Sequence, residues 1–240
     1  MNKSDFPVRI NKYLKDMGVA SRRKADEIVR RGHVTINGKT ATLGELVHEN
    51  DEVAVDSVFL KNMSERLYVL FNKPIGIVSH NPISGQKEVA DLLPDHLKNK
   101  ELAVLGRLDR ASHGLMLLSN NGLIVDKLLN PKSHHEKEYV VELDKPVTNF
   151  FLKRMKEGVH LQGGLTSRKT KVETISDTTI RITLTEGKKH QIRRMTDSLS
   201  FAVRDLKRIR IGSLTLGNLK EGEFRVLEGQ EKADFLSSLN

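Results

Sequence analysis

The hydrophobic pattern of the chain changes at Leu67, and this change divides the sequence into two parts. Before it, apolar residues recur at helical spacing over residues 10–17 and again over residues 25–29. Alternating apolar residues then flank Asn37-Gly38, a pair typical of a tight hairpin turn. We therefore expect two short helices followed by a small sheet in about the first 56 residues.

The second part of the chain is dominated by short apolar runs bounded by turn residues, which is typical of buried strands. Strands are expected at 67–71, 102–106, 115–119, 138–144, 181–185, 209–216 and 224–227. Helices are expected over 122–129, over 147–157, and after Gly187 as far as about Met195. Strands and helices follow no strict alternation, so the pattern predicts an α+β fold with a mixed sheet.

Residues 57–66 show no clear hydrophobic period and are expected to form a linker. The chain has 240 residues, which is enough for two modest domains. We therefore predict a small domain over residues 1–60 and a larger one over residues 67–240.

The sequence contains no cysteine, which excludes disulfides, thiolate zinc sites and cysteine nucleophiles. Four histidines invite a metal hypothesis, but no carboxylate stands at ligand spacing from them, so no metal is expected (His113, His134, His135 and His190). The chain also has neither a P-loop nor a Gly-rich dinucleotide motif, and no cofactor is expected. Covalent chemistry would therefore need an oxygen or nitrogen nucleophile.

The formal net charge is +9, and the excess of positive charge lies in two blocks. Residues 9–39 carry a net +6 and residues 187–220 a net +7. These blocks are either two solvated faces or two places where one long anion touches the protein. The N-terminus lacks the apolar core of a secretory signal, and no apolar run is long enough for a membrane span, so a cytoplasmic protein is expected.

The first basic block has a motif that suggests RNA binding. Arg22, Arg23 and Lys24 open the second expected helix, where unpaired backbone N–H groups attract phosphate. Charge alone leaves an ordinary solvated helix face equally open. The pattern RINKYLKDMGVASRRKADEIVRRGHVTINGK, however, resembles the S-four (alpha-L) RNA-binding domain. That resemblance implies RNA-facing roles for five residues: Arg9, Lys12, Arg22, Arg23 and Lys24.

The polar loop between two expected strands holds Asp109 between Arg107 and Arg110. Adjacent positive charge favours the ionised carboxylate. An ionised carboxylate in a loop can act as a nucleophile or a base. A surface salt bridge is the alternative that this segment alone leaves open.

Four motifs occur in a fixed order along the second part: NKP at 72–74, GRLD at 106–109, KEY at 137–139 and QIRRM at 191–195. Together they resemble the pseudouridine synthases of the RsuA/RluB/RluE/RluF family, most closely its RluF branch, and the resemblance covers essentially the whole chain. It implies a synthase domain with a mainly antiparallel sheet. The implied activity is conversion of a specific uridine in ribosomal RNA, in a large-subunit 23S rRNA stem-loop, to pseudouridine, by a monomer without a cofactor.

The resemblance also implies roles for individual residues. Asp109 would be the catalytic nucleophile, Tyr139 the ring that stacks on the target base and transfers a proton, and Arg193 the partner of Asp109. Arg107 would replace the flipped-out base, and Lys73 and Arg194 would contact RNA. Without the resemblance, a tyrosine in the core of a strand is the commoner role for a residue such as Tyr139. A solvated helix face is the alternative for Arg193 and Arg194.

Several alternatives stay open at the level of sequence. A non-catalytic RNA-binding or ribosome-assembly factor would use both basic blocks without Asp109, and an RNA methyltransferase would require S-adenosylmethionine. Relatives in the RluF branch often have an acidic residue at Ala111 and a glycine near Ser200, and some carry a basic tail. These differences leave open which uridine is modified. The sequence also leaves open whether Asp109 attacks C1′ or C6 or promotes a glycal intermediate.

Overall fold

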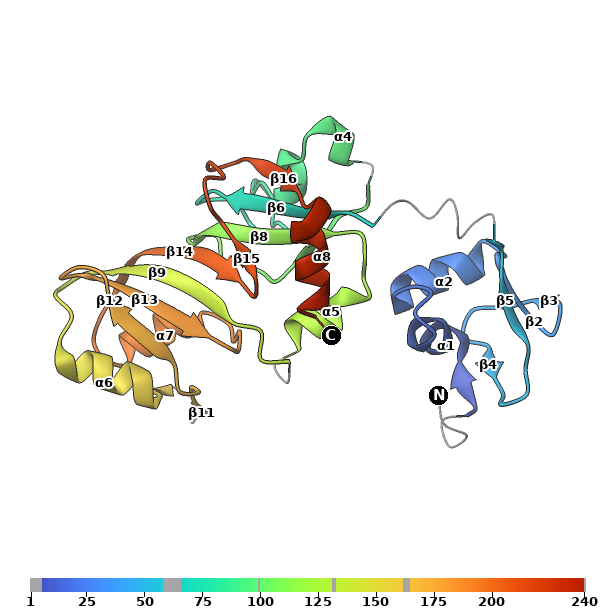
Figure 1. Ribbon diagram of the computed structural model, residues 1–240, viewed down its shortest axis with the longest axis horizontal. Helices are drawn as coiled ribbons and strands as arrows, with labels where there is room; N and C mark the ends of the chain where they lie inside the picture. The colour runs from blue at the N-terminus through green and yellow to red at the C-terminus, as the bar shows by residue number, and fades with distance from the viewer. Residues whose placement is uncertain (1–5, 58–65, 99, 131–132, 162–164, 240) are drawn as a thin grey trace. The chain divides into compact units, whose positions relative to one another are not determined.

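The computed structural model of the protein describes residues 6–57, 66–98, 100–130, 133–161 and 165–239 (Figure 1). The chain separates into two compact units, Met1–Arg66 with Asn120–Val125, and Leu67–Ser119 with Asp126–Asn240. Most of the expected linker, at 58–65, lies outside the described residues. Among the described helices, none has the length and apolar character that spanning a membrane requires.

The first unit has the two short helices and the small sheet that the sequence predicts. Its second helix begins at Arg22 because the Ser21 hydroxyl caps it, accepting a hydrogen bond from Lys24 N at 3.5 Å. Asn37 and Gly38 both take positive φ, as the predicted hairpin turn requires. In chain order the elements are β1 (Val8–Arg9), α1 (Ile10–Asp16), α2 (Arg22–Arg30), β2 (Val34–Ile36), β3 (Lys39–Thr40), β4 (Leu46–Val47) and β5 (Val53–Val55).

The apolar faces of α1 and α2 form the core of this unit with the strands. Ile10 and Leu14 from α1 pack with Ile28 and Val29 from α2, and Val34 of β2 joins them. All five side chains are buried. The helical stripes identified in the sequence are therefore the buried faces of both helices, which leaves their basic residues toward solvent.

The second unit contains a mixed sheet in which nine of the described strands take part. The main order is β12 (Lys171–Thr174), β13 (Thr179–Leu184), β9 (Lys137–Leu143), β14 (Val203–Ile211), β8 (His113–Ser119), β6 (Tyr68–Lys73) and β16 (Phe224–Val226). At the side, β15 (Leu214–Thr215) pairs with β14 and β7 (Ala103–Leu105) with β8. Within this sheet β14 and β8 are parallel and the other pairs antiparallel, so the predicted α+β class and mainly antiparallel sheet are confirmed.

Helices and short strands flank the sheet (Figure 1). They are η2 (Val89–Leu92), α4 (Asp95–Lys98), α5 (Ile124–Leu129), α6 (Asn149–Glu157), β10 (His160–Leu161), β11 (Leu165–Thr166), α7 (Gln191–Asp197) and α8 (Gly229–Ser237). Helix α6 lies by β12, where Phe151 enters the core. Helix α8, which the sequence analysis did not predict, places Phe235 edge-on to Tyr68 of β6 at 5.9 Å between ring centroids.

The parallel contact of β8 with β14 fixes the middle of the sheet and depends on Gly114. This residue has φ +101°, and a Cβ there would lie 2.3 Å from the carbonyl oxygen of Arg208. Only glycine allows so close an approach of two backbones at that φ. The loop that carries Asp109 runs directly into β8, so this contact sets where the loop begins and ends.

Candidate active site

A cleft of about 830 Å³ opens beside the centre of the sheet in the second unit. The loop between β7 and β8, strand β9, the segment after β13 and the start of α7 line it. Asp109, Tyr139 and Arg193 come from separate parts of the sequence, but they lie together in the wall of this cleft. Arg107 also lines it. The structure thus brings into one cleft the three residues to which the sequence analysis gave catalytic roles.

The Asp109 loop is held in place by hydrogen bonds to the segment that follows β6. The Ser79 hydroxyl donates to the carbonyl of Leu108 at 2.6 Å and accepts from its N–H at 3.0 Å. Gly76 N donates to the carbonyl of Arg110 at 2.8 Å, while the Arg110 side chain donates back to the Gly76 carbonyl at 3.1 Å. Asp109 therefore lies between two residues whose backbones are fixed.

Arg208 supports the beginning of the same loop from inside the protein. Its side chain is only 1% exposed, and its guanidinium donates to three carbonyls, of Leu115 at 2.7 Å, Gly106 at 3.0 Å and Arg107 at 3.3 Å. Planar guanidinium donors suit such a set of carbonyl acceptors. Arg208 falls within the second basic block of the sequence, but its side chain organises the loop and does not face solvent.

Lys73 corrects a prediction, because it cannot contact RNA as expected. The residue is 0% exposed, and its ammonium donates to the carbonyls of Pro74 and Ser112, each at 2.7 Å. Burial lowers the pKa of Lys73 to about 8, although the negative charge of Asp109 opposes that shift. Lys73 therefore ties β6 to the end of the Asp109 loop and adds positive charge behind the carboxylate.

The contacts of Asp109 also differ from the expectation. In the described part of the chain its carboxylate pairs with His190, with 3.4 Å between Oδ1 and Nε2, and does not pair with Arg193. Arg193 donates to the carbonyls of Ala111 at 2.9 Å and Val203 at 3.2 Å. Arg193 thus holds the loop at Ala111, two residues after Asp109, because its guanidinium donates to backbone carbonyls.

His190 is a cleft residue that the sequence analysis considered only as a metal ligand. It precedes α7 with φ 52°, a conformation that is uncommon for a residue with a side chain. Its position directly before the QIRRM motif at 191–195 could have pointed to it. The side chains of His190 and Arg193 both line the cleft.

Tyr139 lies in β9 between the core and the cleft. It is 8% exposed, belongs to the hydrophobic core of the second unit and also lines the cleft. Its neighbour Glu138 pairs with Arg210 at 2.9 Å and Arg181 at 3.4 Å. Because side chains alternate along a strand, Tyr139 faces away from these ion pairs and toward the cleft.

The segment before α7 is shaped by Glu186, which is 7% exposed. Its carboxylate accepts from Gln191 Nε2 at 2.5 Å and from Arg168 N at 3.2 Å. Lys188 N donates to Gln191 Oε1 at 3.0 Å and closes the turn. The hydrogen bonds of Glu186 and Gln191 thus shape the turn that presents His190 and Arg193 to the cleft. Arg194 lies on α7 and is not among the residues lining the cleft.

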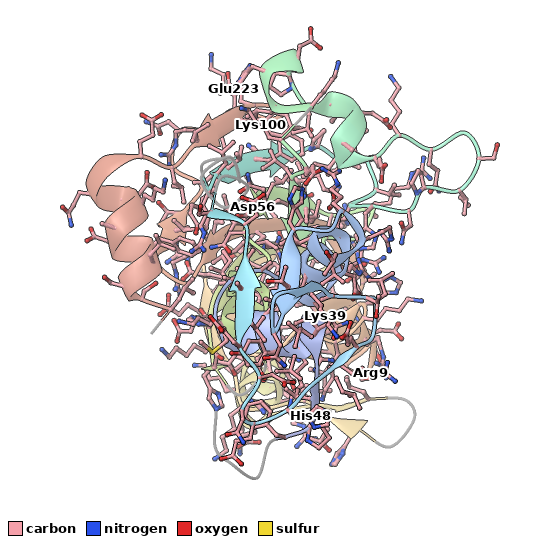
Figure 2. The ribbon with its side chains drawn as sticks, turned by 90° about the vertical axis from the view of Figure 1, so that its right-hand side faces the viewer. Arg9, Lys39, His48, Asp56, Lys100 and Glu223 are labelled. Carbon is pink, nitrogen blue, oxygen red and sulfur yellow. The ribbon has the colours of Figure 1, made fainter. Side chains whose placement is uncertain are left out.

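The RNA-facing residues predicted in the first unit are partly available to a ligand. Arg22 and Arg23 are exposed at the start of α2. Arg9 is exposed in β1 (Figure 2). Lys24 pairs with Glu27 at 2.9 Å, and Lys12 lies 3.9 Å from Asp16. The three arginines are therefore the more accessible part of this predicted surface.

Comparisons with known proteins agree with this architecture. Residues 67–198 match the family described as RNA pseudouridylate synthase, and residues 8–53 match the S4 domain. The chain is similar to the dual-specificity RNA pseudouridine synthase RluF of Escherichia coli (strain K12), with 38% identity over 96% of this chain and 79% of that protein. It is also similar to the ribosomal large subunit pseudouridine synthase B of Bacillus subtilis (strain 168), with 34% identity over 93% of each chain.

A solved structure, described as the crystal structure of pseudouridylate synthase, resembles the chain along almost its whole length. The TM-score is 0.71 with 29% sequence identity, and the match covers 97% of this chain and 100% of that one. The fold expected from the sequence, with an S-four domain in front of a synthase domain, is thereby confirmed.

Proposed function

The chain belongs to the RNA pseudouridylate synthase family, and from this premise we propose that it converts a uridine of ribosomal RNA to pseudouridine in the cleft that holds Asp109. The observation that carries the assignment to this cleft is that Asp109, Tyr139 and Arg193 line it together. Each comes from a different segment, a loop, a strand and a helix, and a purely structural role would not require them to converge.

The reaction explains why these residue types are needed. The bond between C1′ and N1 breaks, the uracil rotates, and C1′ joins C5, so the target nucleotide must first leave its stack. Attack by a carboxylate on C1′, attack on C6 and removal of a proton to give a glycal all need an ionised carboxylate beside that nucleotide. Asp109 supplies this group, with His190, Lys73 and Arg193 around it.

Tyr139 would provide one wall for the base during rotation. A ring that is held in a strand and opens to the cleft can stack against uracil, and such stacking contributes about 1–3 kcal/mol per base. Arg193 would act through the backbone of Ala111, which it holds at 2.9 Å, and so orient the loop that carries the nucleophile. Arg107, exposed at the mouth of the cleft, would fill the space that the extruded base leaves.

The likeness to RluF and to the large-subunit synthase points to the kind of RNA. We assign the substrate to a stem-loop of the large-subunit rRNA, with the front domain over residues 1–60 holding the RNA backbone and the domain over residues 67–240 carrying out the chemistry. A monomer working in the cytoplasm suits this role, because ribosomal RNA is there and one chain carries the complete set of cleft residues.

The proposal is tested by mapping pseudouridine at single-nucleotide resolution in rRNA from cells with and without the protein. We expect one site, or a few sites in one stem-loop, to lose the modification, and the purified protein to restore it without an added small molecule. Identical maps, together with RNA binding, would favour the alternative of a ribosome-assembly factor. Restoration only with S-adenosylmethionine, or methylation in place of isomerisation, would indicate a methyltransferase.

A further inference from the structure

Lys137 stands at the start of β9, two residues before Tyr139, and the function proposed above gives it no role. Side chains two residues apart on a strand lie on one face, about 7 Å apart at Cα. The intervening Glu138 is occupied on the opposite face, where it accepts from Arg210 Nε at 3.0 Å. Lys137 and Tyr139 accordingly both line the cleft.

The ammonium of Lys137 has a poor set of protein partners. Its hydrogen bond runs to the carbonyl of His135 at 3.4 Å, which is long for a charged donor. It forms no ion pair with the residues that the structure describes. Burial lowers the pKa of Lys137, and the positive charge of Arg208 lowers it further. The protein therefore holds a desolvated cation in the cleft without compensating it.

Lys73 shows how this chain satisfies a buried lysine when the role is structural. Its ammonium donates to two carbonyls at 2.7 Å each. Arg208 likewise finds three carbonyl acceptors. Lys137 has neither arrangement, although it lines the cleft, as Arg208 also does. Such an incompletely paired cation in a cleft marks a place where a ligand provides the missing acceptor.

On the basis of the proposed function, we propose that Lys137 donates a hydrogen bond to a carbonyl oxygen of the target uracil and stabilises the negative charge that develops there. A lysine two residues from Tyr139 on the same face reaches the rim of a base stacked on that ring. An ammonium can only donate, so it selects a carbonyl oxygen of the base.

The charge in question arises on every route to the product. When C1′–N1 breaks, its electron pair stays with uracil and spreads to the ring carbonyl oxygens; addition of a carboxylate at C6 also delivers charge to a carbonyl oxygen. C1′ then bonds to C5, the C5 proton leaves, and N1 gains a proton, so the atoms of substrate and product balance. Lys137 keeps its protons throughout and acts by placing a fixed positive charge where negative charge appears.

The test compares Lys137→Gln, which removes the charge at similar length, and Lys137→Arg, which keeps it. Lys153→Gln is the matched control, because Lys153 is exposed on α6 and is not among the residues lining the cleft. Single-turnover pseudouridine formation is measured on rRNA from cells lacking the protein, at saturating enzyme, alongside the Kd for that RNA and the thermal melting temperature.

We expect Lys137→Gln to lower the single-turnover rate about 30-fold or more, with Kd within about threefold, as for loss of a preorganised charge in a catalytic site. Lys137→Arg should recover most of that loss, and Lys153→Gln should match the parent. An unchanged rate in Lys137→Gln would overturn the inference, as would a loss seen only in Kd or explained by a lowered melting temperature. If the parent itself forms no pseudouridine, the proposed function fails, which is a separate outcome.

Discussion

Two buried cations by the cleft, Lys73 and Arg208, donate to carbonyl oxygens and form no ion pair with the residues that the structure describes. A cation held by carbonyl oxygens keeps its positive charge available to neighbouring groups. The nearest functional group to benefit is Asp109, whose charge acts on Lys73. The protein thus places fixed positive charge close to its candidate nucleophile. Once RNA covers the cleft and excludes water, the attraction between these charges would become stronger.

The buried ammonium of Lys73 predicts a distinct pH dependence of stability. The pKa of Lys73 is about 8 in the folded chain against an ordinary value of 10.5. Between these values the unfolded chain holds a proton that the folded chain has released, so the free energy of unfolding rises with pH. The difference has a ceiling of about 3 kcal/mol.

The measurement is urea unfolding of the parent and of Lys73→Met between pH 7.5 and 10.5. We expect the parent to gain stability relative to the variant as pH rises through this window, and the variant to lack that gain. Curves that stay parallel over the whole range would show that Lys73 is not charged and buried in the way described.

At the scale of residues, the sequence predicted three side chains that share the cleft but not the contacts that they make. Asp109 and Tyr139 were identified because their motifs resemble a family, and the structure places both in one cleft. The contact of Asp109 with His190 was missed, since a pair of side chains from two loops depends on the tertiary fold. Lys73 was assigned to RNA from the resemblance alone. A lysine is seldom fully buried, and the carbonyl partners of Lys73 explain why this one is.

The strands and helices that the sequence predicted well are those with a clear apolar period. Strand β6, helix α2 and helix α6 lie where the pattern placed them. Strand β14 was predicted to start later, because its first half carries charged residues; in the structure Arg208 is buried and Arg210 is paired with Glu136 and Glu138. Helix α8 depends on Phe235 packing against Tyr68, a tertiary contact with no local signal.

The parallel pairing of β8 with β14 yields a prediction at the scale of elements. Gly114→Ala should lower the free energy of unfolding by about 2–4 kcal/mol, because a Cβ would overlap the Arg208 carbonyl and the residue has positive φ. Urea unfolding measures the change.

Gly187→Ala is the control for this substitution, since a Cβ there meets nothing within 4 Å and no left-handed φ is involved. It should change stability by less than about 0.5 kcal/mol. A Gly114 variant as stable as the Gly187 variant would mean that the two strands do not approach each other as closely as the structure has them.

Across the whole molecule, part of the charge in the two basic blocks is bound within the protein and part is exposed. In the second block, Arg208 and Arg210 bind within the protein and Arg193 holds the Asp109 loop, so part of that charge is structural. In the first block, Arg22 and Arg23 are exposed. The sequence could count these charges, but only the structure tells which of them remain available to a polyanion.

The accessible arginines of the first unit predict how RNA binding responds to salt. Replacing Arg22, Arg23 and Lys24 together by alanine should weaken rRNA binding, because up to three phosphate contacts are lost. The slope of log Kd against log salt concentration should fall by about two. Lys24 contributes least, since it already pairs with Glu27.

Filter binding from 50 to 300 mM salt would measure this slope. The control is a variant in which Lys153, Lys156 and Lys169, exposed on the second unit, are replaced by alanine. An unchanged slope would show that the start of α2 faces solvent in the complex. A collapsed melting temperature would point instead to loss of the first unit's fold.

The most direct measurement of the central claim is the single-turnover rate of Asp109→Asn on rRNA that lacks the modification, together with its Kd. The side chain is 37% exposed in the cleft, so an amide of the same shape should fold and bind RNA within a few-fold of the parent. We predict that this variant forms no pseudouridine. Formation at the parental rate would contradict a catalytic role for Asp109 and for the cleft around it.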